Sequence, residues 1–315
     1  MSGRSTPDPA ESSAAASNRG GWEGSDIEQD DLDWLLKTRR ITAEVICRRP
    51  GSDLEPVLES GERVVFLAHF QRGFGLPASP FYRDFLDFFG LQPHHLPANA
   101  ITSLSAFTSF MEGYLGLWPT VAAWAKYFRL RKQTIPNKEE VVKDMTACGA
   151  ASITPRKHSP FPRITGLESC RKWQRSFFYV KSPAVRDVLN LSEFNITPPA
   201  AELNWNYDPQ DTIPEVQLIH QTLEGLLAKK FGADDLLRTF VMRRVNPLQY
   251  RVHKICHMSG LLDPIWVSTH DLTHPQVRRR VKAIAQTEMA DDWQWGVEPF
   301  ERSRLPPPVS LLPWN

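Results

Sequence analysis

Three closely spaced helix patterns, rich in aromatic residues and lying between Ser79 and Lys132, limit most strongly how this chain can fold. Ser79 and Pro80 suit the N-cap and the first position of a helix, and Gly90 suits the residue after its end. Because each aromatic ring carries a large apolar area, this short helix is expected to anchor the core. Its apolar residues are Phe81, Tyr82, Phe85, Leu86, Phe88 and Phe89.

Two further helices are predicted directly after the first. Apolar residues recur at helical spacing across residues 99–115, and they do so again after Pro119. The short connections between these helices contain proline and glycine, which favours a compact helical unit. The apolar positions are Ile101, Leu104, Phe107, Met111, Tyr114 and Leu115 in the second helix, and Val121, Trp124, Ala125 and Phe128 in the third.

The rest of the chain predicts more helices than strands. A first helix is expected over residues 27–36, and others are expected after Pro214, after Asp234 and over residues 275–289. Strands are expected only in the apolar run at residues 64–67 and in the aromatic segment 173–181. Residues 131–163 lack a regular pattern and are expected to form a loop, with at most one short helix near residues 138–146. The predicted fold class is mainly α with a few short strands: a compact helical domain with disordered N-terminal and C-terminal ends.

Composition places the chain among ordinary globular proteins, with 41% hydrophobic and 23% charged residues. No stretch approaches the 18 or so apolar residues that span a bilayer, and the N-terminal segment lacks the apolar region of a secretory signal. The four cysteines are widely separated, so a disulfide framework is not expected. We therefore expect a soluble intracellular protein without a membrane partner, and the sequence leaves nucleus and cytoplasm open.

Three blocks within residues 64–119 resemble a plant family whose members are described as gypsy-type transposon or transposase domain proteins. The blocks are RGFGLP at residues 72–77, FLDFFGLQPHHLPANA at 85–100 and EGYLGLWP at 112–119. The resemblance implies derivation from a retrotransposon-associated reading frame, and it brings no catalytic residue to this chain. The family motif residues are Arg72, Gly73, Phe74, Gly75, Leu76, Pro77, Gly90, Leu91, Gln92, Pro93, His94 and His95.

The domain organisation follows from these patterns and from the resemblance. Residues 1–24 are expected to be a disordered tail because they hold too little apolar surface to offset the entropy of ordering. The other expected units are a short helix with a connector (25–60), the gypsy-type domain (61–200), a C-terminal helical region (201–290) and a proline-rich tail (291–315).

The chain contains carboxylate, histidine and cysteine side chains that could support catalysis, but they form no recognisable catalytic or metal-binding motif. A transposition enzyme needs three carboxylates around metal ions, but Asp84 and Asp87 are predicted to lie on the exposed edge of an aromatic helix. His94 and His95 are expected to fix a turn between two helices by hydrogen bonds, with ligand binding by one of them left open. We predict no catalytic, cofactor or metal site, and a protein that is not an enzyme. The other residues considered are Glu112, Asp208 and Asp211 as carboxylates, and His253, Cys256 and His257, which lack the usual fourth zinc ligand.

Positive charge gathers in residues 229–282, which hold 11 Lys and Arg against 4 Asp. Such a patch is typical of nucleic-acid phosphate contacts, and it is also typical of a solvated helical face. The predicted contact residues are Arg243, Arg244, Arg251, Arg278, Arg279 and Arg280.

These observations predict a non-enzymatic, helical protein-association module, with either a second copy or another protein as its partner. Two alternatives stay open at this point: nucleic-acid binding through residues 229–282, and a diverged metal-dependent transposition enzyme.

Overall fold

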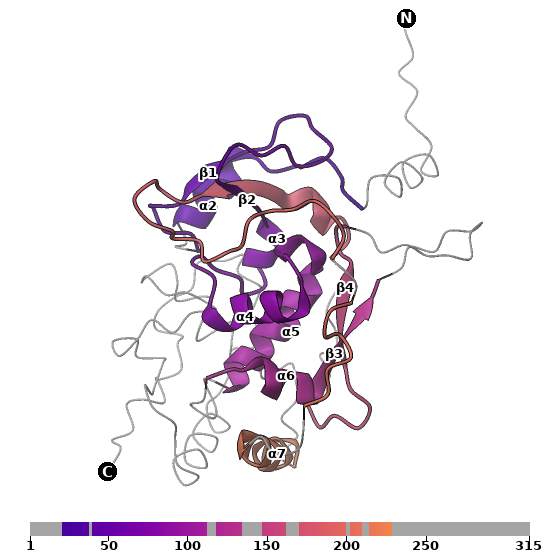
Figure 1. Ribbon diagram of the computed structural model, residues 1–315. Coiled ribbons are helices and arrows are strands. Elements are labelled where there is room, and N and C mark those ends of the chain that lie inside the picture. Colours follow the sequence, from indigo (N-terminus) through magenta and orange to yellow (C-terminus); the bar gives the residue numbers. More distant parts are fainter. Residues whose placement is uncertain are drawn as a thin grey trace, which may run out of the picture.

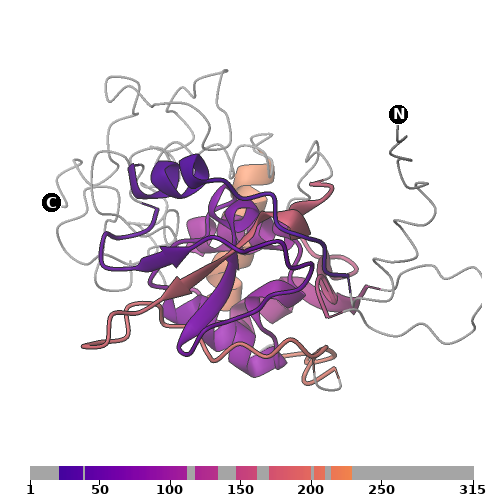
Figure 2. The ribbon, with the colours of Figure 1, turned by 90° about the horizontal axis from the view of Figure 1, so that it is seen from above.

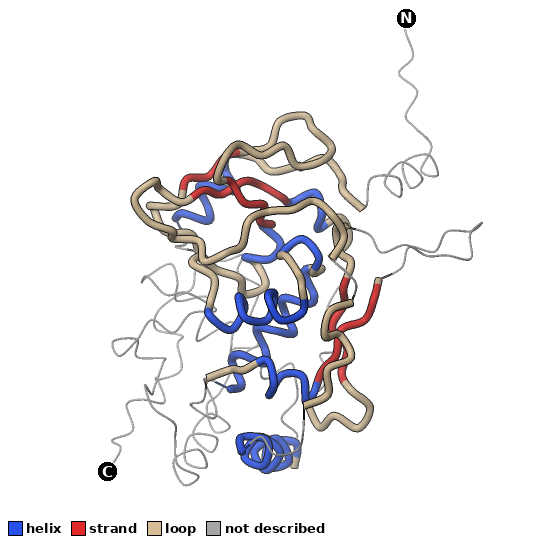
Figure 3. The backbone as a smooth tube through the Cα atoms, in the orientation of Figure 1, coloured by secondary structure: helices blue, strands red, loops and turns tan. Residues whose placement is uncertain are grey.

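The chain folds into helices packed between two antiparallel sheets, as Figures 1 and 3 show for this computed structural model. The structure describes residues 21–37, 40–111, 118–133, 147–161, 170–199, 202–209 and 214–228. Among these residues, no helix is long and apolar enough to cross a membrane.

The larger sheet contains β1 (Ile46–Arg48), β2 (Glu62–Phe66) and β5 (Phe177–Lys181), in the order β1-β5-β2. Tyr179 of β5 lies opposite Arg48 of β1 and Val64 of β2. Because side chains alternate along a strand, the sheet buries apolar residues on both faces and separates two clusters. Val65, Phe178 and Val180 belong to the main core with the helices, and Val64, Phe66, Phe177 and Tyr179 belong to a smaller aromatic cluster. Figure 2 shows the sheet lying across the helices.

The helices form as their sequence patterns predict near α4, and less closely elsewhere. Ser79 Oγ accepts a hydrogen bond from the Tyr82 N–H at the start of α4, and Gly90 ends the helix with a φ of 63°. Phe85 and Phe89 of α4 pack on Trp124 of α6, with ring centroids 4.8 and 5.4 Å apart. The α-helices are α2 (Gln29–Lys37), α3 (Leu67–Phe70), α4 (Pro80–Phe89), α5 (Ala98–Ser109), α6 (Val121–Tyr127) and α7 (Pro214–Leu227); 3₁₀ turns η1 (Pro93–His95) and η3 (Trp173–Ser176) complete them.

A β-hairpin occupies part of the segment that was expected to be a loop. Strand β3 (Phe128–Lys132) pairs antiparallel with β4 (Ala151–Pro155), and Leu130 lies opposite Ile153. Phe128 and Leu130 are buried, so β3 alternates apolar and basic residues as a half-buried strand does. Phe128 also falls at helical spacing after Trp124, which is why the pattern assigned it to the preceding helix.

The prediction of a mainly α fold is wrong, because two antiparallel sheets frame the helices. The strands that the sequence did not reveal have three to five residues, and alternation over so few positions is a weak signal. Strand β1 in particular becomes a strand only because β5, far away in sequence, supplies its hydrogen bonds.

The N-terminal end of the described chain is packed into the fold. Trp22, which falls in the predicted disordered tail, is 1% exposed and stacks on Phe66 with ring centroids 6.0 Å apart. Ser25 donates a hydrogen bond to the Phe177 carbonyl at 2.6 Å, and the Asp26 N–H donates to the Arg175 carbonyl at 2.7 Å. Residues 1–20 of the predicted tail, most of the C-terminal helical region and the proline-rich end lie outside the described residues.

Candidate functional site

The first block of family motif residues forms a buried turn between α3 and α4. Gly73, Phe74, Gly75 and Leu76 are all buried. The Phe74 N–H donates to the His69 carbonyl at 3.0 Å, and Ser105 Oγ of α5 donates to the Arg72 carbonyl at 2.8 Å. This block therefore joins two helices inside the core and presents no open loop.

The second block forms the tight turn η1, and its polar side chains are used within the protein. His95 Nδ1 accepts from the Gln92 N–H at 3.0 Å, and His95 Nε2 lies 3.1 Å from the Thr197 carbonyl, to which it must donate. The Gln92 amide donates to the Glu193 carbonyl and accepts from the Asn195 N–H. These bonds of Gln92 and His95 fasten the turn to residues 193–197.

Three buried histidines lie close together beside the smaller aromatic cluster. His94 is fully buried, with Trp22 and Phe194 ring centroids 5.4 and 5.0 Å away, and the described residues offer its ring nitrogens no hydrogen-bond partner. His69 stacks on Trp173. Burial lowers the pKa of His69 to about 3 and that of His95 to about 4, and it holds the pKa of His94 well below its ordinary value. All three rings are therefore neutral at pH 7, and His69 and His95 also hydrogen-bond to the backbone carbonyls of Leu96 and Thr197.

The carboxylates considered for metal chemistry do not meet in the described part of the chain. Asp84 and Asp87 are exposed on α4, as predicted, and Asp87 pairs with Arg83 at 2.7 Å. Asp208 is exposed and pairs with Arg156. Within the residues that the structure describes, no group of three His, Cys, Asp or Glu side chains is arranged to hold a metal ion.

The other predicted site residues cannot be placed. Glu112, Asp211, the His253–Cys256–His257 group and the six arginines predicted to contact nucleic acid all lie outside the described residues.

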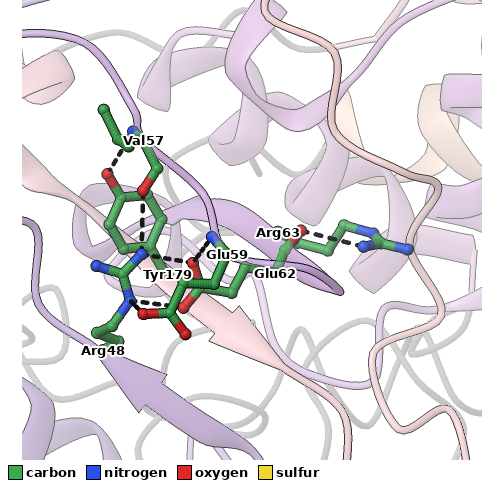
Figure 4. A network of polar contacts seen from close by, with 6 residues as sticks. All are labelled: Arg48, Val57, Glu59, Glu62, Arg63 and Tyr179. Carbon is green, nitrogen blue, oxygen red and sulfur yellow. Dashed lines mark hydrogen bonds and ion pairs between the residues drawn. The ribbon is translucent and has the colours of Figure 1, made fainter.

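A polar network on the larger sheet joins charged side chains of β1 and β2 to Tyr179 of β5 and to the segment before β2 (Figure 4). Arg48 of β1 reaches across the Tyr179 ring, 4.1 Å from its centroid, and donates from Nε to Glu62 Oε1 at 2.7 Å and from Nη2 to Oε2 at 2.5 Å. The Glu59 N–H also donates to Glu62. Burial raises the pKa of Glu62, but the hydrogen bonds from Arg48 and Glu59 outweigh it and hold that pKa below its ordinary value.

The network fixes the backbone of Val57 on both sides. The Val57 N–H donates to Tyr179 Oη at 2.9 Å, and the Val57 carbonyl accepts from Arg48 Nη2 at 3.0 Å (Figure 4). The Val57 side chain is nevertheless 58% exposed. An apolar side chain is thus held in a fixed position in solvent.

Two more exposed aliphatic residues belong to the same part of the chain. Ile46 is 55% exposed on β1, on the same face as Arg48, and Leu54 is 46% exposed three residues before Val57. We call Ile46, Leu54 and Val57 the β1-edge surface. Sequence analysis missed it because Pro50, Gly51 and Pro56 mark residues 48–60 as a connector, and isolated aliphatic residues in a connector form no pattern.

Comparison with known proteins identifies the domain that carries the buried motif. Residues 64–132, from β2 to the end of β3, match the family model described as "Putative gypsy type transposon". No curated protein and no solved structure matches the chain. The match spans all three motif blocks that the sequence resemblance rested on, and the first two are largely buried in the core. What the comparison shows is therefore a local similarity: residues 64–132 of this chain are similar to the family described as "Putative gypsy type transposon".

Proposed function

We propose that this chain is a non-enzymatic protein-association module derived from a gypsy-type retrotransposon, and that its β1-edge surface binds a second copy of the chain. One observation carries the proposal: Val57 is held by side chains from β1 and β5 through both its N–H and its carbonyl, while its side chain stays largely in solvent.

A fixed apolar side chain binds a partner at a lower entropic cost than a mobile one. Association normally costs free energy for ordering interface side chains and loops. In this protein the ion pair between Arg48 and Glu62 and the hydroxyl of Tyr179 have already ordered the backbone of Val57. Contiguous exposed apolar groups mark interaction surfaces, and Arg48, which holds the Val57 carbonyl, is two residues from Ile46 on the same face of β1.

A second copy is the partner that the surroundings of β1 favour. Strand β1 is an edge strand of an antiparallel sheet, and an exposed edge is a template for pairing with another strand. A two-fold axis at this edge brings the same patch together from both copies, so the patch must be self-complementary. Charges of both signs flank it, with Arg49 on one side and Asp53 and Glu55 on the other, all of them exposed.

The use of the family motif inside the core supports the non-enzymatic part of the proposal. The side chains of Gln92 and His95 are committed to the backbone of residues 193–197, and the rest of the described motif is largely buried. A catalytic group must instead reach its substrate within hydrogen-bond distance. The carboxylates Asp84 and Asp87 lie on the outer side of α4, where Asp87 is already paired.

Sedimentation equilibrium of the full chain tests the association. We expect reversible dimerisation of the wild type, and we expect the Ile46→Asp/Val57→Asp variant to weaken it by at least about tenfold, since each change places a charge in a desolvated apolar contact. Leu203→Asp is the matched control: Leu203 is 49% exposed near the end of α4, and its variant should dimerise like the wild type.

A second variant tests whether the fixed position of Val57 strengthens dimerisation independently of the apolar area of the β1-edge surface. Tyr179→Phe removes the acceptor of the Val57 N–H and leaves Ile46, Leu54 and Val57 unchanged. Dimerisation should weaken several-fold, in line with about 1 kcal/mol for one hydrogen bond. A wild type that stays monomeric at every concentration, or a Leu203→Asp variant as impaired as the double variant, would contradict the proposal.

A further inference from the structure

The β3–β4 hairpin carries positive charge on its outward side. Arg129 and Arg131 alternate with the buried Phe128 and Leu130, so both point away from the core. Lys132 follows at the end of the strand and is exposed. By the same alternation Lys132 falls on the other face, opposite the buried Ala151, so the basic ribbon is defined as Arg129 and Arg131 with their cross-strand partners Thr154 and Ser152.

Acidic residues are missing from the described parts of this region. Residues 118–133 and 147–161 contain no Asp or Glu. Their only Lys and Arg residues are Lys126, Arg129, Arg131, Lys132, Arg156 and Lys157. Arg156 is taken up in the fold, where it donates to the carbonyls of Ala125 and Phe128 and pairs with Asp208.

The charges of the basic ribbon differ from most other arginines in being unpaired. Within the described part of the chain, no ion pair or side-chain hydrogen bond engages Arg129 or Arg131, and Arg129 Nε is buried without a partner. Elsewhere, ion pairs with carboxylates hold Arg48, Arg63, Arg83, Arg156, Arg175 and Arg186. The ribbon thus keeps charge available for a partner that is itself negative.

We propose that the basic ribbon binds the phosphate backbone of nucleic acid. Arg129 and Arg131 are two residues apart on an extended strand, which separates their Cα atoms by about 6.6 Å. An extended strand therefore presents cations in a regular row, and a nucleic-acid strand presents its phosphates in the same way. Arginine, lysine, serine and threonine are the side chains that proteins use for phosphate contacts, and the ribbon consists of these.

The composition of the ribbon also argues against a membrane surface as its target. Surface helices and segments that bind membranes combine basic residues with apolar side chains that enter the lipid. The outward residues Arg129, Arg131, Ser152 and Thr154 include no apolar side chain, and the hairpin's apolar residues Phe128, Leu130 and Ile153 pack on the core. A face that offers positive charge and no apolar side chain to enter lipid fits the phosphates of a nucleic-acid backbone.

The ribbon lies on different elements from the β1-edge surface, so the two proposals stand apart. Dimerisation is measured without nucleic acid, and a chain that fails to dimerise can still bind a labelled oligonucleotide. Loss of the β1-edge surface should leave one ribbon per chain intact.

Fluorescence anisotropy of the full chain with labelled duplex DNA and labelled single-stranded RNA, across a salt series, tests the ribbon. We expect binding that weakens steeply with salt, because phosphate contacts release counterions. The Arg129→Glu/Arg131→Glu variant should bind at least about tenfold more weakly, and the slope of log K against log salt should fall by about 2, one for each lost contact. The control Lys37→Glu/Arg171→Glu changes the net charge equally at exposed positions outside the ribbon and should retain most of the affinity.

Three outcomes would overturn the inference. One is the absence of binding at low salt. The second is an equal loss in the control variant, which would assign binding to net charge alone. The third is unchanged binding by the ribbon variant. Loss of all affinity on changing Arg278, Arg279 and Arg280 to Glu would then assign the binding to those residues. Binding of the ribbon to phosphatidylserine vesicles, and not to either oligonucleotide, would likewise replace nucleic acid with a membrane.

Discussion

Lowering the pH from about 7 to about 4.5 is expected to reduce the free energy of unfolding by roughly 5 kcal/mol through His69 and His95, and further through His94. His69, His94 and His95 all have folded-state pKa values below the ordinary 6.5, chiefly because burial disfavours the charged ring. Since the unfolded chain takes up these protons near pH 6.5 and the folded chain does not, stability is complete above pH 6.5 and is lost as the pH falls below it.

The size of the loss follows from the width of the pH window. One pKa unit corresponds to about 1.4 kcal/mol, so two units below 6.5 cost roughly 2–3 kcal/mol for each of His69 and His95. The sum approaches the total stability of a typical domain, about 5–15 kcal/mol. Urea unfolding followed by tryptophan fluorescence at a series of pH values measures it.

Replacing His94 isolates one of the three contributions. Among the described residues no hydrogen bond of ordinary geometry reaches the His94 ring nitrogens, so His94→Leu should change stability little at pH 7 and should make the protein less sensitive to acid. His158→Gln, at an exposed turn, should keep the wild-type acid transition. If His94→Leu shows the same pH dependence as the wild type, the buried histidine is not a source of acid lability.

Trp22→Ala is expected to destabilise the fold by about 3–5 kcal/mol and to lower the melting temperature by roughly 10 °C. Trp22 is 1% exposed and contacts Phe66, His94, Phe177 and Phe194, so truncation leaves a large cavity in the smaller aromatic cluster. Calorimetry of the full chain measures the change.

Trp118→Ala provides the comparison for Trp22. Trp118 is 52% exposed, so its removal should cost no more than about 1 kcal/mol. Equal melting temperatures for the wild type and Trp22→Ala would mean that residues 21–27 are not part of the folded domain.

The sequence predicted the elements that are determined by residues within or next to the element itself. Helix α4 has its cap residue, its proline and its terminal glycine within the pattern itself, and all three act as expected. The run at residues 64–67 predicted β2 because its apolar, β-branched residues are consecutive. In both cases the physical cause lies within a few residues of the element.

Elements that depend on distant partners were missed. Strand β1 is held by β5 more than a hundred residues later, and Trp22 is buried only because Phe66, His94 and Phe177 come together around it. The serine-, alanine- and glycine-rich composition before Trp22 indicated a tail and gave no sign of these contacts. The β1-edge surface was hidden for the same reason, since Val57 owes its fixed position to Tyr179 and Arg48.

Burial of the family motif explains why a specific resemblance predicted membership and no activity. The motif residues supply a core turn, a helix end and a histidine turn, all of which determine the fold. The two surfaces proposed to bind partners lie outside these motif residues, on β1 and on the β3–β4 hairpin.

Native-state hydrogen exchange of the full chain at pH 7 tests most directly whether the motif is core or functional loop. The amides of Phe74, Leu91 and Leu96 donate to the carbonyls of His69, Leu86 and Pro93 inside the fold. They should open only with the free energy of global unfolding, as slowly as the amides of the central strand β5. Functional loops come from the least stable parts of a protein, so exchange at these amides far faster than in β5 would contradict a structural role for the motif.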